Sequence, residues 1–275
     1  MNETVLVVAL LAVVLGINTV GFRNTVHFLN VGYAFSIIAL SVLVSVLFGS
    51  RLGLFSALQM TGLLIWGGRL GVFVLRREAR PSYQQESKRL QNRYGHAKVP
   101  AKLAIWIGVS ILYVLMFLPA LYHLSGTAQL PTPTTVAVEL VGVTLLCGGL
   151  LLETKADQQK SAYKALHPRE FCGVGLYQWV RCPNYLGEIL FWLGGWLMGV
   201  PFYSGPWQWL GSLAGLIGII LIMMSSTKRL EAEQESRYGN LPAFQSHVRR
   251  TPVLFPFVPI YTLRGLFDSG TPGRQ

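Results

Sequence analysis

Seven stretches of this chain are apolar over enough residues to cross a lipid bilayer, which takes about 20 residues in a helix. They lie near residues 3–21, 27–49, 52–75, 103–123, 134–153, 185–203 and 207–226. Only 13% of the 275 residues are charged, whereas a soluble domain usually carries about 25%. The sequence therefore predicts an all-α, polytopic protein with seven transmembrane helices, which form a single membrane domain over residues 1–275.

Both ends of the apolar pattern are consistent with this prediction. The first run, from about Thr4 to Val20, lacks a basic segment before it and a small-residue cleavage site, so we interpret it as a retained helix. Near the other end, the segment "TPVLFPFVPIY" contains three prolines, and a proline inside a helix removes a hydrogen bond and clashes with the preceding turn. We therefore expect this segment to lie at the membrane surface.

The basic residues are concentrated in three segments. Of the 23 Lys and Arg residues, 20 lie in 76–102, in 155–181 or from 228 onward, while 122–133 and 201–208 contain none. With seven spans, the basic segments share one side, and the positive-inside rule predicts an outside N-terminus and a cytosolic C-terminus, with Arg51 as the exception. The net charge of +11 thus indicates orientation in a membrane and no nucleic-acid partner, and it leaves open whether the cytosolic face also holds an anionic ligand.

Metal chemistry has little support in the sequence. The three cysteines, Cys147, Cys172 and Cys182, have no metal-ligand spacing and form no disulfide framework. The five histidines are scattered. We therefore expect no metal site.

Ionisable residues at membrane depth are costly and are functional candidates by default. The candidates are Arg69, Glu139, Glu153, Asp157 and Glu188, joined by the polar residues Asn30, Gln59 and Asn184. Glu139 is close to the outer end of its run, so we expect it at a solvated helix end. Asp157, Arg181, Asn184 and Glu188 all map to the cytosolic ends of the fifth and sixth helices. Asn184 and Glu188 are four residues apart and therefore share one helix face.

Three segments of the carboxy-terminal half resemble a known family. They read "ETKADQQKSAY", "GLYQWVRCPNYLGEILFWLGGW" and "YGNLPAFQSHVRRTPVLFPFVP". The chain resembles the steroid 5-alpha-reductase family, and most closely its bacterial branch, firmly over 150–260 and traceably over 25–100. The "GLYxxVRxPNYLGE" block is shared with isoprenylcysteine carboxyl methyltransferases and sterol C14-reductases, so it does not select the reaction.

The resemblance implies a cofactor site. The reductases are seven-helix membrane enzymes with NADPH in the bundle, reached from the cytosol. By resemblance, Asp157, Asn184 and Glu188 contact this cofactor, Tyr177 and Arg181 lie in the matching segment, and Arg69 stands where the third helix has an arginine. From the residues themselves, Lys160 and Lys164 are candidates to bind phosphates by charge-assisted hydrogen bonds.

The resemblance also implies a substrate site, where this chain departs from the mammalian members. Those carry a Gln-Glu pair in the second helix and a tyrosine in the third, and these positions hold Asn30, Val31 and Trp66 here. The acid is thus missing, and Tyr33 is the candidate substitute donor. We expect catalytic roles for Asn30, Tyr33 and Trp66 on a substrate side, residues 1–102, with the cofactor side in 103–275.

The expected activity is NADPH-dependent reduction of the carbon–carbon double bond of a 3-oxo-delta4 steroid or a similar apolar enone. The substrate would enter from the bilayer of a bacterial inner membrane, where lipid surrounds a monomeric enzyme. One alternative is an S-adenosylmethionine-dependent isoprenylcysteine-type methyltransferase. The segment "KRLEAEQESRYG" resembles the tail of that family, although Arg181-Cys182-Pro183 stands where that family has an Arg-His-Pro triplet. Another is a non-catalytic lipid-binding protein with a decayed site.

Overall fold

The computed structural model describes residues 3–78, 99–126 and 132–264, and in these residues every regular element is a helix. Seven segments are long and apolar enough to cross a membrane, namely Glu3–Phe22, Thr25–Leu47, Leu54–Glu78, Val99–Ser125, Pro133–Leu166, Pro183–Phe202 and Pro206–Tyr238. The seven predicted spans are therefore confirmed. Of the basic segment 76–102, residues 79–98 lie outside the described part of the chain.

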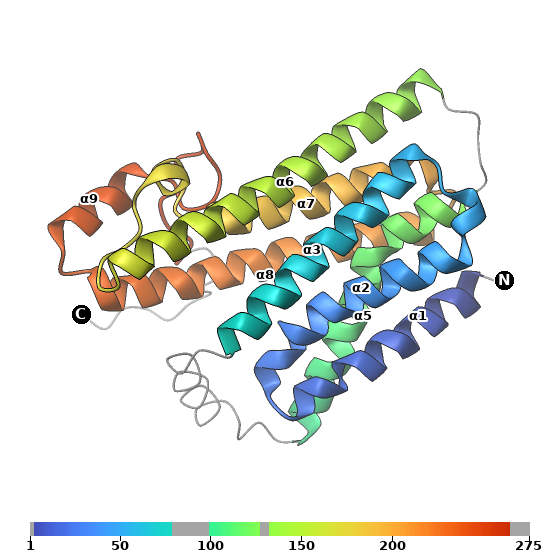
Figure 1. The fold of residues 1–275 in the computed structure, drawn as a ribbon, viewed down its shortest axis with the longest axis horizontal. Coiled ribbons are helices and arrows are strands. Elements are labelled where there is room, and N and C mark those ends of the chain that lie inside the picture. Colours follow the sequence, from blue (N-terminus) through green and yellow to red (C-terminus); the bar gives the residue numbers. More distant parts are fainter. Residues whose placement is uncertain (1–2, 79–98, 127–131, 265–275) are drawn as a thin grey trace. The chain divides into compact units, whose positions relative to one another are not determined.

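Figure 1 labels the helices in chain order. They are α1 (Glu3–Asn18), α2 (Val31–Leu47), α3 (Leu54–Glu78), α5 (Val99–Ser125), α6 (Pro133–Leu166), α7 (Pro183–Gly199), α8 (Pro206–Tyr238) and α9 (Pro242–Arg250). The chain divides into two compact units, Met1–Thr144 with Gly194–Ile217 (unit 1) and Leu145–Leu193 with Gly218–Gln275 (unit 2). Helices α6, α7 and α8 each contribute to both units. The predicted division into a substrate side and a cofactor side at residue 102 stays a prediction.

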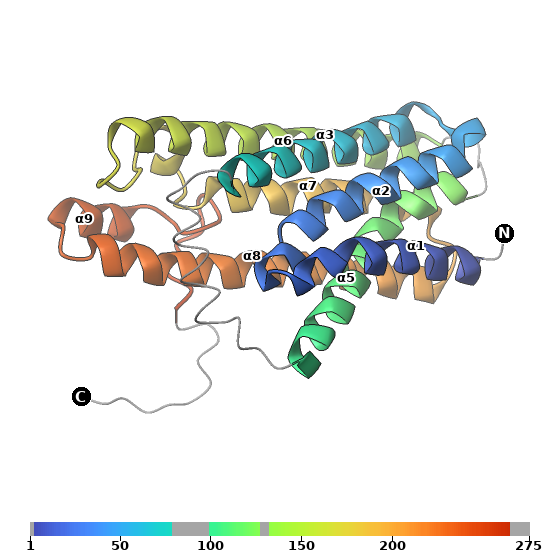
Figure 2. The same cartoon turned by 60° about the horizontal axis from the view of Figure 1, so that its bottom comes forward.

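In unit 1, α2 packs against α1 and α3, and α5 contacts all three helices (Figure 2). Gly67 permits the close approach of α3 to α2, because a Cβ atom there would lie 2.7 Å from the Ile38 side chain, and small residues let helix backbones approach in membranes. Two polar contacts join α1 to α5. The Asn18 amide donates to Ser110 Oγ over 3.2 Å, and Trp106 Nε1 donates to the Leu15 carbonyl over 2.9 Å.

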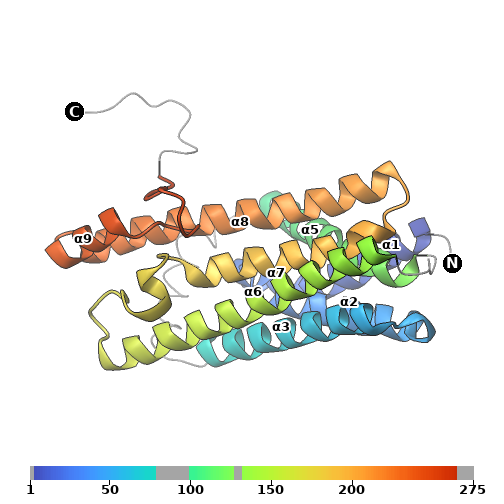
Figure 3. The same ribbon diagram turned by 90° about the horizontal axis from the view of Figure 1, so that it is seen from above.

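In unit 2, α6 and α7 lie side by side (Figure 3) and touch through two glycines. A Cβ atom on Gly149 would lie 2.4 Å from the backbone nitrogen of Phe191, and one on Gly187 would lie 2.6 Å from that of Glu153. The two backbones therefore meet directly. Because α6 continues to Leu166, Asp157 lies inside a helix, which corrects the expectation that it lies at the helix end. Glu153, at the end of the apolar run, lies inside the same helix.

Unit 2 also contains the second part of α8, helix α9, and non-helical chain around the helix ends. Gly175 has φ +60°, a conformation that favours glycine, and the Gln159 side chain fills the space where a Cβ would stand. The "TPVLFPFVPIY" segment forms no spanning helix, as predicted. Its residues Val253 and Leu254 are buried. The Pro252 and Val253 carbonyls accept hydrogen bonds from the backbone of residues 181 and 182, so the segment is docked on the chain that leads into α7.

Candidate functional site

Helices α6 and α7 carry most of the polar residues expected to bind a cofactor. On α6, residues 153, 157, 160 and 164 follow one another at spacings of three or four, which places them on one face of the helix. Helix α7 begins at Pro183, so Asn184 lies in its first turn and Glu188 in its second. Glu188 is 9% exposed. The glycine contact between the helices brings these two sets of side chains into one region of unit 2.

Two tyrosines show that this region is shared. Tyr185, next to Asn184, lies within electrostatic range of both the Asp157 and the Glu188 carboxylates. Tyr177 Oη donates a hydrogen bond to the Ala156 carbonyl over 3.3 Å. Burial raises the pKa of Tyr177, and the Asp157 carboxylate raises it further. Tyr177 is therefore an un-ionised phenol beside Asp157 at neutral pH.

Two polar groups of this region keep their hydrogen-bonding capacity. Within the described chain, the half-buried Asn184 carboxamide makes no hydrogen bond, and the Lys160 ammonium makes no hydrogen bond or ion pair. Lys160 nevertheless lies within electrostatic range of Cys172 and Cys182. The Asn184 carboxamide and the Lys160 ammonium are thus positioned by helices but make no hydrogen bond within the described chain.

Two of the cations expected at the cofactor site have protein partners. Lys164 Nζ donates to the Glu170 carbonyl and, over 2.6 Å, to Tyr238 Oη. The Arg181 guanidinium is buried and its Nη2 donates to Glu231 Oε1 over 2.6 Å and to the Tyr261 carbonyl. Both side chains therefore hold non-helical segments of unit 2 against its helices.

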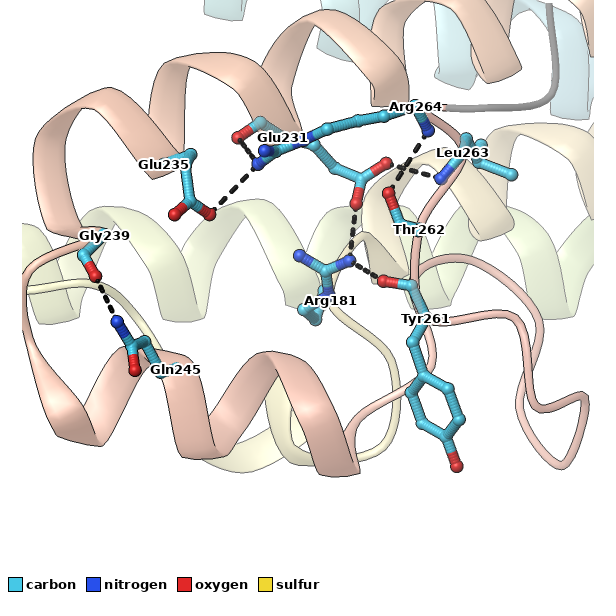
Figure 4. A network of polar contacts seen from close by, with 9 residues as sticks. All are labelled: Arg181, Glu231, Glu235, Gly239, Gln245, Tyr261, Thr262, Leu263 and Arg264. Carbon is cyan, nitrogen blue, oxygen red and sulfur yellow. Dashed lines mark hydrogen bonds and ion pairs between the residues drawn. The ribbon is translucent and has the colours of Figure 1, made fainter. Parts of the chain in front are cut away.

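The Arg181 contact belongs to a larger network (Figure 4). Glu231 Oε2 accepts the backbone N–H of Leu263 over 2.9 Å. Arg264 donates to the Glu231 carbonyl over 2.9 Å and to Glu235 Oε2 over 3.1 Å. Sequence reasoning missed Glu231, although a buried arginine needs an acidic partner and Glu231 and Glu235 share a helix face by their spacing.

The residues expected to act on a substrate lie in unit 1. Tyr33 and Trp66 are both buried, and their ring centroids are 4.8 Å apart in an edge arrangement. Tyr33 also stacks on Tyr113 at 4.8 Å, and Tyr113 Oη donates to the Phe28 carbonyl over 2.7 Å. The structure thus joins Tyr33 and Trp66, and it adds Tyr113, an aromatic residue of the fourth span that no sequence signal distinguished.

Asn30 and Arg69 are close in sequence to residues of this aromatic cluster, Asn30 three residues before Tyr33 and Arg69 three residues after Trp66. Asn30 immediately precedes α2, is half-buried and makes no side-chain capping bond. Val31, at the position of the missing acid, is the first residue of α2. Arg69 is half-buried on α3, three residues and so nearly one turn after Trp66. Arg69 therefore belongs to unit 1, whereas the other expected cofactor residues belong to unit 2.

Unit 1 also contains a buried polar cluster of Gln59, His123 and Glu139, which the sequence did not predict. His123 Nε2 lies 2.9 Å from Glu139 Oε1, and His123 Nδ1 lies 2.7 Å from Gln59 Oε1. Gln59 Nε2 donates to the Gly195 carbonyl over 2.9 Å, which fixes the orientation of its amide. Glu139 is 5% exposed, so the expectation of a solvated helix end is wrong, because His123 supplies a partner inside the protein.

The orientation of the Gln59 amide also indicates the donor role of one His123 ring nitrogen. The oxygen of Gln59 faces Nδ1, so that ring nitrogen carries a proton. Nε2 then either donates to a carboxylate or accepts from a carboxylic acid. In both cases His123 and Glu139 together carry no net charge, which is the arrangement that a buried pair needs.

Among the residues that the structure describes, no group of three His, Cys, Asp or Glu side chains is arranged to hold a metal ion. The seven apolar helices and the buried polar residues between them define a multi-pass helical membrane protein. A family model described as protein of unknown function, DUF1295, matches residues 18–251, and the chain belongs to this family, whose members are steroid 5-alpha-reductase-like membrane proteins. No curated protein and no solved structure matches the chain.

Proposed function

We propose that this protein is an NADPH-dependent reductase that saturates the carbon–carbon double bond of a 3-oxo-delta4 steroid or a similar apolar enone. The supporting observation is the polar region of α6 and α7. Asn184 and Glu188 lie one turn apart on α7, and Tyr185 beside them lies near Asp157 of α6. A buried carboxylate such as Glu188 is expensive in a membrane helix and is a functional candidate by default.

The residues present fit a nucleotide in two respects. The Asn184 carboxamide has no hydrogen-bond partner in the described chain, so it can bind an amide or hydroxyl of a ligand. The Lys160 ammonium also makes no hydrogen bond or ion pair in the described chain, so it can bind a phosphate by a charge-assisted hydrogen bond. Asp157 and Glu188 are acceptors for ribose hydroxyls or for the nicotinamide. NADPH supplies the hydride, and the protein supplies placement and electrostatics.

On the substrate side, the chain must hold the ketone oxygen as negative charge develops on it. Tyr33 is un-ionised in this proposal and donates a hydrogen bond to that oxygen, with Asn30 as a second donor. Oxyanion-type stabilisation of this kind is usually a large catalytic contribution. Trp66 packs against Tyr33 and limits its rotation. An apolar substrate reaches these rings from the bilayer.

Binding of NADPH to the purified protein in lipid nanodiscs tests the cofactor assignment. We expect Asn184→Ala and Glu188→Ala each to weaken binding by about 1–3 kcal/mol, the range for removing a partner of a buried polar group. Glu233→Ala is the matched control, because Glu233 is an exposed carboxylate on α8 of the same unit and forms an exposed ion pair with Arg237. Equal NADPH affinity in all three variants would contradict the assignment.

Turnover of progesterone tests the substrate assignment. We expect Tyr33→Phe and Asn30→Ala to lower the reduction rate by about 100- to 1000-fold, the usual effect of losing one oxyanion donor, while NADPH affinity is unchanged. Wild-type rates in both variants would place the donor elsewhere. If the wild-type protein bound S-adenosylmethionine and not NADPH, the methyltransferase alternative indicated by "KRLEAEQESRYG" would replace the reductase.

We also propose that the N-terminus lies outside a bacterial inner membrane and the C-terminus in the cytosol, because of the distribution of basic residues. Ser204 and Ser236 are both exposed and are suited to single-cysteine labelling in a cysteine-free background. We expect Ser204→Cys to react with an impermeant maleimide in intact cells and Ser236→Cys to react only after lysis. The opposite pattern would reverse the orientation.

A further inference from the structure

Unit 1 contains a cavity at the end where α5 stops and α6 begins. The start of α1, the connection from α2 to α3, the end of α5 and the connection from α7 to α8 surround a volume of about 380 Å³. Ligand pockets typically measure about 300–1,000 Å³. None of the residues proposed above for NADPH or for the enone lines this cavity. It is therefore a separate candidate site.

The cavity wall carries one acid and one base. Glu3 of α1 and Arg51 of the α2–α3 connection both line it, and no ion pair joins them in the described structure. Arg51 Nη1 donates to the Ser125 carbonyl over 3.0 Å, which uses one of the five N–H donors of a guanidinium. Glu3 Oε2 accepts from Gln208 over 3.1 Å, and the Tyr122 hydroxyl also donates to the Glu3 carboxylate. Each charge is thus oriented by the protein and keeps capacity for a ligand.

Aromatic side chains form part of the remaining wall, and the protein holds them in place. The rings of Tyr122 and Tyr203 meet edge to face at 6.0 Å, and Tyr203 Oη donates to the Trp196 carbonyl over 3.0 Å. The Phe202 ring stacks on His123 at 4.6 Å, so the buried His123–Glu139 pair supports the cavity wall from behind. Ring faces attract ammonium groups, more strongly when water is excluded.

We propose that this cavity binds a zwitterion. Its ammonium group is bound by Glu3 and the aromatic wall, and its phosphate or carboxylate group is bound by Arg51. A purely anionic ligand would meet the Glu3 carboxylate, and a purely cationic ligand would meet the Arg51 guanidinium, so the pair of charges favours a ligand that carries both. Arginine suits the anionic end because its planar fork matches carboxylate and phosphate oxygens.

This site also gives a reason for the one basic residue that the charge distribution leaves unexplained. Arg51 lies at the end of unit 1 whose other connections, 126–132 and 200–205, contain no Lys or Arg. Arg51 does not follow the charge distribution that orients the chain. Its side chain instead binds the carbonyl of Ser125, the last residue of α5, and lines the cavity. The same chemistry occurs in the headgroup of a zwitterionic lipid and in a small soluble zwitterion.

Two binding measurements on the full-length protein test the proposal and separate the two sources. Native mass spectrometry after release from nanodiscs of mixed phosphatidylethanolamine and phosphatidylglycerol measures retained lipid, and calorimetry with phosphoethanolamine measures a soluble zwitterion. Retention of phosphatidylethanolamine over phosphatidylglycerol supports a lipid headgroup, and calorimetric binding of phosphoethanolamine supports a soluble ligand. Equal retention of both lipids together with no calorimetric binding of phosphoethanolamine overturns the proposal.

Matched variants assign the binding to the cavity. We expect Arg51→Gln and Glu3→Gln each to reduce zwitterion binding at least tenfold, and Arg76→Gln, an exposed arginine at the far end of α3, to leave it unchanged. Because Arg51→Gln also removes the bond to Ser125, Arg51→Lys is the second variant, which keeps the charge and should retain part of the binding. Undiminished binding in Glu3→Gln overturns the zwitterion in favour of a simple anion site.

Discussion

Among the residues that the structure describes, each unit contains a buried acid–base pair, and the two pairs are built differently. In unit 1, His123 and Glu139 are completed by Gln59, and all the groups involved come from helices. In unit 2, Arg181 and Glu231 also bind backbone groups of a non-helical segment, at Tyr261 and Leu263. The first pair therefore joins helices to one another, whereas the second fastens an irregular segment to a helix.

The difference follows from how each environment satisfies backbone hydrogen bonds. Helices satisfy their own N–H and C=O groups, so side chains between them need only satisfy each other. An irregular segment leaves backbone groups that need partners, and Glu231 and Arg181 supply them. Arginine is always charged, while His123 and Glu139 can share one proton without net charge. Losing a partner should thus cost more in unit 2 than in unit 1.

The largest effect is expected from Glu231→Ala, which leaves the Arg181 guanidinium buried without its carboxylate. Breaking a buried ion pair from one side costs about 3–5 kcal/mol. Thermal unfolding in detergent measures the loss, and limited proteolysis reports release of residues 251–264. Glu233→Ala, an exposed carboxylate two positions along the same helix, is the control and should change neither reading. An unaltered melting temperature in Glu231→Ala would show that the tail is held elsewhere.

A smaller effect is expected from His123→Leu, which leaves Glu139 and Gln59 in apolar surroundings. The expected cost is that of unsatisfied buried polar groups, about 1–3 kcal/mol. The same thermal unfolding measurement compares it directly with Glu231→Ala. If His123→Leu proved the more destabilising of the two, the proposed contrast between the units would be reversed.

A still smaller effect is expected at the glycine contact of unit 2. Gly149→Ala places a Cβ 2.4 Å from the Phe191 backbone nitrogen, and overpacking of this kind costs about 1–3 kcal/mol. The gain in helix propensity over glycine offsets about 1 kcal/mol of that cost. Gly148→Ala is the matched control, since nothing lies within 4 Å of its Cβ position, and it should be neutral or stabilising.

The smallest effect is a difference in thiol reactivity within unit 2. Burial raises the pKa of Cys182 to about 12 and also raises that of the half-buried Cys172. The thiolate is the reactive form, so raising the pH from 7 to 9 should speed maleimide labelling of Cys172 and leave Cys182 unlabelled in a Cys147→Ser background. Glu231→Ala should make Cys182 reactive, because the segment whose Val253 carbonyl binds the Cys182 N–H is released.

The sequence predicted correctly those features that depend on the residues of a single helix. Seven apolar runs were enough to predict seven spans, and the spacing of Asn184 and Glu188 was enough to place them on one face. It could not show partners brought together from distant positions. His123 and Glu139 belong to different helices, and Arg181 and Glu231 are separated by 50 residues, so no local pattern connects them.

The errors have the same origin. Glu139 was expected in water because its position in its own helix is near an end, yet a neighbouring helix supplies His123. Asp157 was expected at a helix end because hydropathy falls there, yet backbone hydrogen bonds continue α6 to Leu166. Hydropathy marks where a helix leaves an apolar environment and not where the helix stops.

The length of α6 has a consequence for any water-soluble ligand. Its 34 residues at about 1.5 Å each give a helix of about 51 Å, whereas the hydrocarbon core of a bilayer is about 30 Å thick. If its first turns mark one boundary of the hydrocarbon, the other boundary falls near Glu153. The part of α6 beyond the lipid tails then lies in the headgroup layer and water, and it carries Asp157, Lys160 and Lys164. A charged molecule can reach these residues from the water without crossing the hydrocarbon core of the bilayer.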